Sequence, residues 1–419
     1  MSACGIGATN LTGVLWKTVS EACNLACDYC YYSKCKGKID QLNIIEDEVL
    51  EKFIKEYMAM SNGVASFVWQ GGEPLLAGLD FFKKVVSLQA KYAKQNTIIS
   101  NSVQTNGTLI TREWAKFFKR YNFLVGVSLD GPKHINDAKR VTGSGGGSFN
   151  SIMKGIQYLR DEKVDFNILT VIHEGNVTKG NELMEFYLNE QFQYIQFIPC
   201  MDFKAQEVGQ LGRYTITPKE YGDFLCQVFD SWYNDGNPTI SERFFDNMLA
   251  VYLHQEAEIC IHRVTCPKTL ILEQNGDAYP CDFYIHDDFY LGNVGKDPLK
   301  DIINHKKFNE FTRLKENLSE QCLNCEFLHL CHGGCPRARS WDPQKQTVNV
   351  EYFCQSYQQI YQYAHERMQM VAEKIKERKL VEYLQSGGKL PERNDRCICG
   401  SGRKFKKCCE KYKPQYALT

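Results

Sequence analysis

The chain has 419 residues, of which 43% are hydrophobic and 24% charged, so it is long and apolar enough for two or three domains with a substantial core. Lys and Arg together number 50, as do Asp and Glu, so net charge gives no reason to expect nucleic acid or an anionic membrane as the main partner. No apolar stretch approaches the roughly 18–20 residues that cross a bilayer, which excludes an integral membrane protein, and no secretory signal is visible.

Short β-rich runs alternate with helical patterns from about residue 14 to residue 200. The predicted strands are 14–20, 66–70, 98–104, 124–129, 166–172 and 194–199. The predicted helices are 47–60, 80–94, 112–120, 150–161 and 179–190. This alternation predicts parallel strands joined by crossover helices. Because the carboxyl ends of such strands carry the ligand site, we expect the turns that follow them to gather at one mouth.

The second half of the chain has a different organisation. Helices are predicted over 217–234, 241–256 and 355–385. The cysteine-rich stretch 260–354 between them shows little periodicity, so it would need a metal to stabilise its fold. Gly387-Gly388 and Pro391 mark a linker into a small terminal module.

The 19 cysteines are the most informative residues. Without an export signal we expect a reducing, cytoplasmic setting, where clustered thiols hold metal more often than they form disulfides. Cys23, Cys27 and Cys30 follow the first predicted strand. Three such thiolates can bind three irons of a 4Fe–4S cluster and leave the fourth iron open. A zinc knuckle that borrows a remote ligand is the alternative.

Eight further cysteines fall between residues 260 and 354, enough for two complete four-cysteine sites. Zinc at both sites is the alternative to iron–sulfur clusters. Four cysteines of the terminal module predict one tetrahedral zinc site: Cys397, Cys399, Cys408 and Cys409. The remaining cysteines, Cys4, Cys35, Cys200 and Cys226, are interpreted as small buried hydrophobic residues.

The cysteine loop, together with the turn Gly71-Gly72-Glu73-Pro74, resembles the radical S-adenosylmethionine (SAM) enzymes. The resemblance implies an α/β fold with a partial (β/α)6 barrel, in which the open iron chelates the amino and carboxylate groups of SAM. It also implies that an electron from the cluster cleaves SAM to methionine and a 5′-deoxyadenosyl radical. The SAM contacts implied by the resemblance are Tyr29, Gly72, Glu73, Ser128, Arg140 and Met201.

The spacing of the eight middle cysteines resembles the SPASM extension of radical SAM enzymes that modify peptides and proteins. The ligands implied for a first auxiliary 4Fe–4S cluster are Cys260, Cys266, Cys281 and Cys335. Those implied for a second are Cys322, Cys325, Cys331 and Cys354, which makes three clusters in all. The terminal module resembles the SEC-C zinc motif. The domains expected are a radical SAM barrel (1–215), a helical bridge (216–259), a SPASM domain with a closing helix (260–386), and a linker with the SEC-C motif (387–419).

The segments 280–284 (PCDFY) and 331–335 (CHGGC) sharpen the resemblance to the anaerobic sulfatase-maturating enzymes. It implies oxidation of a Cys or Ser in an unfolded sulfatase to Cα-formylglycine, with release of 5′-deoxyadenosine and methionine. Asp282, beside Cys281, matches the family's base; an aspartate that caps a turn is the alternative. The auxiliary clusters would accept the departing electron or shape the peptide site.

The expected partners are the sulfatase polypeptide and a reducing electron donor such as flavodoxin or ferredoxin, without a membrane or nucleic acid. Two other functions stay open. A SPASM enzyme could modify a different ribosomally made peptide, or an iron–sulfur or zinc module could sense redox state or bind nucleic acid. Six basic residues between Arg393 and Lys407 are either a solvated surface or a docking site for an acidic protein or ribosomal RNA.

Overall fold

The computed structural model describes residues 11–33, 35–39, 41–200, 215–342, 344 and 347–412. Two compact units are present. The first contains the described residues up to Thr217 and Thr265–Asn317, and the second contains Pro218–Val264 and the described residues from Leu318 onwards. The division into four consecutive domains stays a prediction. None of the helices in these described ranges combines the length and the apolar character needed to cross a membrane.

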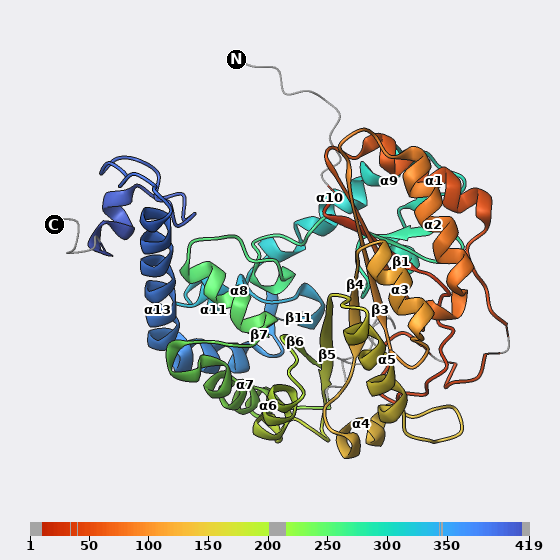
Figure 1. Cartoon of the computed structure of the whole chain (residues 1–419), viewed down its shortest axis with the longest axis horizontal. Helices are drawn as coiled ribbons and strands as arrows, with labels where there is room; N and C mark the ends of the chain where they lie inside the picture. The colour runs from red at the N-terminus through yellow and green to blue at the C-terminus, as the bar shows by residue number, and fades with distance from the viewer. Residues whose placement is uncertain are drawn as a thin grey trace. The chain divides into compact units, whose positions relative to one another are not determined.

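Parallel strands form the centre of the first unit (Figure 1). They are β1 (Gly13–Lys17), β2 (Val64–Gln70), β3 (Ile98–Thr105), β4 (Phe123–Ser128), β5 (Phe166–Ile172) and β6 (Tyr194–Pro199). Each strand pairs in parallel with the next along the chain, so their carboxyl ends share one edge. Side chains such as Trp16, Trp69 and Phe67 are almost fully buried, which provides the hydrophobic stabilisation of this sheet.

Helices follow the strands and lie along the outer face of the sheet (Figure 1). They are α1 (Asp47–Met60), α2 (Leu79–Tyr92), α3 (Arg112–Arg120), α4 (Lys133–Lys139), α5 (Phe149–Asp161) and α6 (Gly180–Asn189). Each longer helix buries an apolar stripe, and α3 begins where the Thr111 hydroxyl accepts a hydrogen bond from the Trp114 N–H. The predicted partial (β/α)6 barrel is confirmed.

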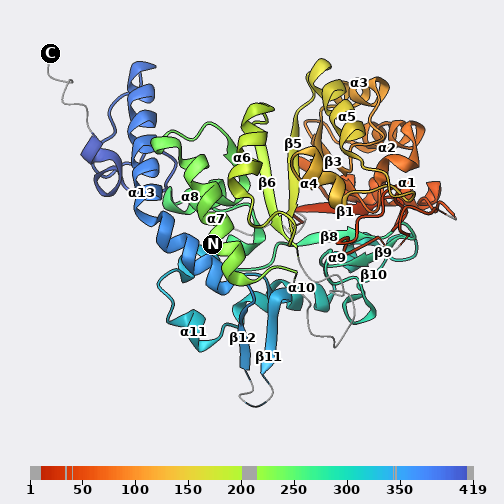
Figure 2. The ribbon, with the colours of Figure 1, turned by 90° about the horizontal axis from the view of Figure 1, so that it is seen from below.

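Three strands that the sequence patterns missed extend the sheet beyond β1. They are β8 (Thr269–Leu272), β9 (Asp277–Tyr279) and β10 (Gly292–Asn293). β8 pairs in parallel with β1, β9 pairs with β8, and β10 pairs with β9, so the three strands continue the sheet outward from β1 (Figure 2). Leu270, Ile271 and Leu272 are buried, but so short an apolar run does not specify a strand by periodicity alone. Two short helices complete this unit, α9 (Leu299–Ile303) and α10 (Lys306–Thr312).

The second unit is mainly helical. It contains α7 (Pro218–Tyr233), α8 (Arg243–Tyr252), α11 (Glu320–Leu323), α12 (Leu328–Cys331) and α13 (Cys354–Gln385), with a hairpin of β11 (Arg339–Asp342) and β12 (Thr347–Glu351). The long helix α13 packs along α7 and α8 and carries the terminal module near its carboxyl end (Figure 1).

Candidate active site

The three cysteines of the first group lie in the loop after β1. The Cys23 Sγ is buried and accepts hydrogen bonds from the Leu25 N–H at 3.4 Å and from the side-chain amide of Asn106 at 3.8 Å. Burial raises the pKa of Cys23 to about 12 and that of Cys27 to about 11. Thiols so buried become thiolates when a bound metal compensates the charge, and N–H groups directed at sulfur suit iron–sulfur ligands. The loop therefore fits a cluster held by Cys23, Cys27 and Cys30.

The turn after β2 is bound directly to this cysteine loop. The Gly72 N–H donates to the Ser20 carbonyl at 2.7 Å, and the Glu73 N–H donates to the Ala22 carbonyl at 2.8 Å. A Cβ atom at Gly72 would lie 2.0 Å from the Ala22 oxygen, so only glycine fits at this position. The predicted cofactor turn and the cysteine loop thus form one rigid piece.

Glu73 is fully buried at the same place. Its Oε1 accepts hydrogen bonds from the Leu75 N–H at 3.0 Å and the Thr105 hydroxyl at 2.8 Å, and its Oε2 accepts one from the Asn106 N–H at 2.8 Å. Burial raises the pKa of Glu73 to about 7 in spite of these hydrogen bonds. The carboxylate joins the ends of β2 and β3. Its predicted contact with the SAM ammonium stays a prediction.

A buried ion pair connects two of the other predicted SAM contacts. Arg140 Nε lies 3.0 Å from Oδ2 of Asp130, and the Tyr29 hydroxyl donates to the same oxygen. The Arg140 guanidinium also lies 5.4 Å from the centre of the Tyr29 ring, against which His173 stacks. Asp130, which the sequence analysis does not single out, therefore positions both residues. The sequence feature that could have identified Asp130 is a charged residue placed directly after an apolar strand.

The other two predicted SAM contacts are Ser128 and Met201. Ser128, at the end of β4, accepts a hydrogen bond from the side-chain amide of Gln104 at 3.0 Å. Met201 lies outside the described residues. Both assignments stay predictions.

Asp282 lies in the first unit, in the segment that follows β9, and both of its carboxylate oxygens have partners. Oδ1 forms an ion pair with the ammonium of Lys17, and Oδ2 accepts a hydrogen bond from the Tyr31 hydroxyl. The side chain of Asp282 is 17% exposed, whereas that of Lys17 is completely buried. The predicted base is thus bound to the end of β1 and to the cysteine loop, close to where the predicted cluster and SAM would lie.

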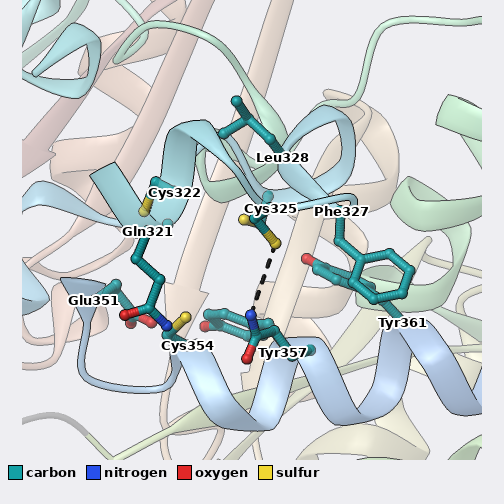
Figure 3. Close-up of a pocket in the computed structure, with 13 residues that line it drawn as sticks. Gln321, Cys322, Cys325, Phe327, Leu328, Glu351, Cys354, Tyr357 and Tyr361 are labelled. Atoms are coloured by element: carbon teal, nitrogen blue, oxygen red, sulfur yellow. Dashed lines mark hydrogen bonds between the residues drawn. The ribbon is translucent and has the colours of Figure 1, made fainter. Parts of the chain in front are cut away.

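The second predicted auxiliary set comes together in the second unit. Cys322, Cys325, Cys331 and Cys354 line one cavity (Figure 3). Its remaining wall combines aromatic and apolar side chains with three polar ones, Gln321, Gln358 and Glu351. The side-chain amide of Gln358 donates to Cys325 Sγ at 3.7 Å. Burial and the neighbouring thiolates Cys322 and Cys331 raise the pKa of Cys354 to about 12. Four thiols around one cavity fit a fully ligated 4Fe–4S cluster.

The first predicted auxiliary set draws on both units. Cys266 and Cys281 belong to the first unit, and Cys260 and Cys335 belong to the second. Their assignment to a common cluster stays a prediction.

The terminal module forms a compact thiol cluster. The sulfurs of Cys397, Cys399, Cys408 and Cys409 all lie within 4.8 Å of one another, which suits a single tetrahedral metal ion. Phe405 and Leu380, the latter from α13, are completely buried against these cysteines. The geometry of this site fits the predicted zinc.

Comparison with known families gives three matches in chain order. Residues 18–186 match the radical SAM superfamily, residues 265–326 match the SPASM iron-sulfur cluster-binding domain, and residues 393–411 match the SEC-C motif. The fold and the cysteine loop thus define a radical SAM protein with an iron–sulfur extension.

Comparison with individual proteins identifies the family within this class of radical SAM proteins. A cysteine-type anaerobic sulfatase-maturating enzyme of Clostridium perfringens is 38% identical over 87% of this chain and 99% of its own length. A serine-type anaerobic sulfatase-maturating enzyme of Bacteroides thetaiotaomicron is 33% identical over 86% of this chain and 91% of its own length. A solved structure, native anSMEcpe with bound AdoMet and Kp18Cys peptide, has a TM-score of 0.79 and 38% identity, and the match covers 86% of this chain and 99% of that one. The chain belongs to the family of anaerobic sulfatase-maturating enzymes.

Proposed function

We propose that this chain oxidises a Cys or Ser side chain of an unfolded sulfatase polypeptide to Cα-formylglycine, with SAM as the oxidising cosubstrate. The observation that carries the proposal is the match to a cysteine-type sulfatase-maturating enzyme over 99% of that protein's length, which takes in both the barrel and the cysteine-rich region. Because a serine-type relative is also 33% identical, the proposal includes both Cys and Ser as target residues.

Cys23, Cys27 and Cys30 would hold the cluster that binds SAM, and Tyr29, Gly72, Glu73, Ser128, Arg140 and Met201 would surround SAM. The cluster would supply the reductive chemistry that turns bound SAM into a source of hydrogen-atom abstraction, and these residues would orient SAM toward the substrate Cβ. The rigid pairing of the Gly72 turn with the cysteine loop would fix SAM relative to the cluster.

The substrate radical must then lose one proton and one electron. A serine target thereby becomes the aldehyde directly, whereas a cysteine target becomes a thioaldehyde, which water hydrolyses to the aldehyde with release of hydrogen sulfide. The Asp282 carboxylate would accept the proton from the target thiol or hydroxyl, since it is partly exposed and bound near the cysteine loop. The electron would pass to an auxiliary cluster. We assign these clusters to Cys260, Cys266, Cys281 and Cys335 and to Cys322, Cys325, Cys331 and Cys354, three clusters in total with the first. The terminal cysteines would hold one zinc ion.

The test is anaerobic reconstitution followed by incubation with SAM, a chemical reductant and two sulfatase peptides that differ only by Cys or Ser at the target. We expect about twelve irons per chain, reductive formation of 5′-deoxyadenosine, and an aldehyde detected by mass spectrometry in at least one peptide. SAM cleavage without aldehyde on either peptide would favour a SPASM enzyme for another ribosomal peptide. A protein that binds zinc alone and does not cleave SAM would be a binding module.

The physiological setting follows from the same chemistry. Reduction of the cluster needs a low-potential electron donor, for which a flavodoxin or ferredoxin is the proposed partner. Cytoplasmic location stays a prediction from the thiol content.

A further inference from the structure

Lys17 is a completely buried lysine at the end of β1, where an ordinary strand residue would be apolar. A buried ammonium is costly unless several groups compensate its charge. Its Nζ pairs with Asp282, lies 3.2 Å from Gln70 Oε1 and 3.4 Å from the Tyr31 hydroxyl, and sits 4.1 Å from the centre of the Tyr32 ring. The ammonium is therefore the common contact of these four side chains.

The fold brings these groups together from separate segments. Lys17 and Gln70 are register partners at the ends of β1 and β2. Tyr31 and Tyr32 follow the cysteine loop, and Asp282 follows β9. A second carboxylate, Glu273, lies directly after β8 and accepts hydrogen bonds from the Tyr32 hydroxyl at 2.8 and 2.9 Å. Tyr32 thus binds Glu273 through its hydroxyl, while its ring faces the ammonium of Lys17, which forms its ion pair with Asp282.

We propose that Lys17 is a positioning residue that holds the Asp282 carboxylate in the orientation needed to take the substrate proton. This inference rests on the proposed function and extends it to a residue on another strand. Lys17 and Tyr31 each bind one oxygen of Asp282, so together they fix the plane of the carboxylate. Without the ammonium, the side chain of Asp282 keeps only its contact to Tyr31 and loses that fixed orientation.

The test compares Lys17→Met, which keeps the length and apolar body of the side chain, with Lys17→Arg, which keeps the charge. Each full-length variant is reconstituted anaerobically with its iron–sulfur clusters. Its iron content, 5′-deoxyadenosine formation and formylglycine formation are then measured separately. We expect Lys17→Met to load iron normally and to cleave SAM within about twofold of wild type, while formylglycine falls roughly 10- to 100-fold. Lys17→Arg should recover part of that loss.

A double-mutant cycle with Asp282→Asn shows whether Lys17 acts through Asp282. In the Asp282→Asn background, Lys17→Met should lower formylglycine by less than about twofold, because the group it positions is already altered. The matched control is Lys52→Met. Lys52 is also in the first unit, and its ammonium donates to the carbonyls of Val294 and Asp297 at 2.7 Å. The Lys52→Met variant should form as much formylglycine per 5′-deoxyadenosine as the wild type.

Three results would overturn the proposal: full product formation by Lys17→Met, an equal loss of SAM cleavage and product at normal iron content, or an undiminished effect in the Asp282→Asn background. If Lys17→Met fails to load iron, Lys17→Gln replaces it in the same cycle. If the wild type forms no formylglycine, the proposed function fails by itself. A crystal structure of Lys17→Met then decides this inference, since an Asp282 carboxylate in its original orientation would refute it.

Discussion

Glu73 is a buried carboxylate whose hydrogen bonds join the ends of neighbouring strands at the ligand-binding edge of the sheet. Its oxygens accept hydrogen bonds from a group that follows β2 and from groups at and just after the end of β3, and it is completely buried. The neighbouring Gly72 lets the backbone of the cysteine loop approach to a distance that no side chain permits. At this scale the residues that shape the site are as important as those expected to touch SAM.

The raised pKa of Glu73 predicts a pH dependence of stability. In the fold Glu73 keeps its proton up to about pH 7, whereas the ordinary value is 4.5, so the folded state binds more protons between these values. The free energy of unfolding therefore falls as pH rises through this window. Between pH 6 and pH 8 the wild type should lose about 1 kcal/mol relative to Glu73→Gln, measured by anaerobic urea unfolding.

At pH 6 Glu73→Gln should be less stable than the wild type by about 1–3 kcal/mol, because its amide group would face an N–H donor, and this difference should shrink by about 1 kcal/mol at pH 8. The exposed Glu48→Gln is the control and should match the wild type. Parallel pH curves for the wild type and Glu73→Gln would contradict the assigned titration.

Gly72→Ala should prevent proper assembly of the cysteine loop. The new Cβ would lie 2.0 Å from the Ala22 oxygen, so the turn after β2 must move away. We expect a loss of SAM binding of at least about tenfold, measured by equilibrium dialysis of the reconstituted protein. Gly146→Ala is the control, since its Cβ would approach Thr142 Oγ1 no closer than 3.4 Å, and it should bind SAM normally.

Among the elements, α13 carries two thiol sites on one helix. Its first residue is Cys354, which lines the auxiliary cavity, and Leu380 near its other end packs against the terminal cysteines. The helix has 32 residues, so its ends are separated by about 48 Å at 1.5 Å per residue. The two sites therefore share a rigid support while lying too far apart to share ligands.

Cys354→Ser should remove one auxiliary cluster and leave the others. We expect iron content to fall by about four per chain, while reductive SAM cleavage continues and formylglycine decreases. Cys226→Ser provides the control, because Cys226 lies on α7 in the same unit and outside the cysteine cavity. If the iron content of Cys354→Ser equals that of the wild type, Cys354 is not a cluster ligand.

For the molecule as a whole, local patterns predicted the parallel barrel closely, and the helices over Asp47–Met60 and Arg112–Arg120 agree residue for residue. These helices could be predicted because their apolar residues repeat at helical spacing over enough residues to be distinctive. β8 was missed because its identity as a strand depends on pairing with β1, more than 250 residues earlier. The cysteine sets were predicted by spacing. Lys17 and Asp130 were missed because their roles depend on partners from other segments of the chain, such as Asp282 after β9 and Tyr29 in the cysteine loop.

Removal of the terminal module tests its independence from the catalytic region. A chain that ends at Gly388 should keep its turnover with a peptide substrate, because the radical SAM and SPASM matches lie upstream. The same truncation uncovers Leu380, so amide hydrogen exchange should accelerate over the last turns of α13. The full-length chain should contain one zinc ion that the truncated chain lacks. Loss of turnover would assign the module a catalytic role.

The pairing of β8 with β1 also has a consequence for synthesis. β1 leaves the ribosome before the other described strands, yet one of its two neighbours is not complete until residue 272. At about 5–20 residues per second, the nascent chain exposes this open strand for more than ten seconds. An unpaired strand rich in Val, Leu and Trp is a template for aggregation, so a chaperone that shields the emerging amino-terminal half should raise the yield of correctly folded protein.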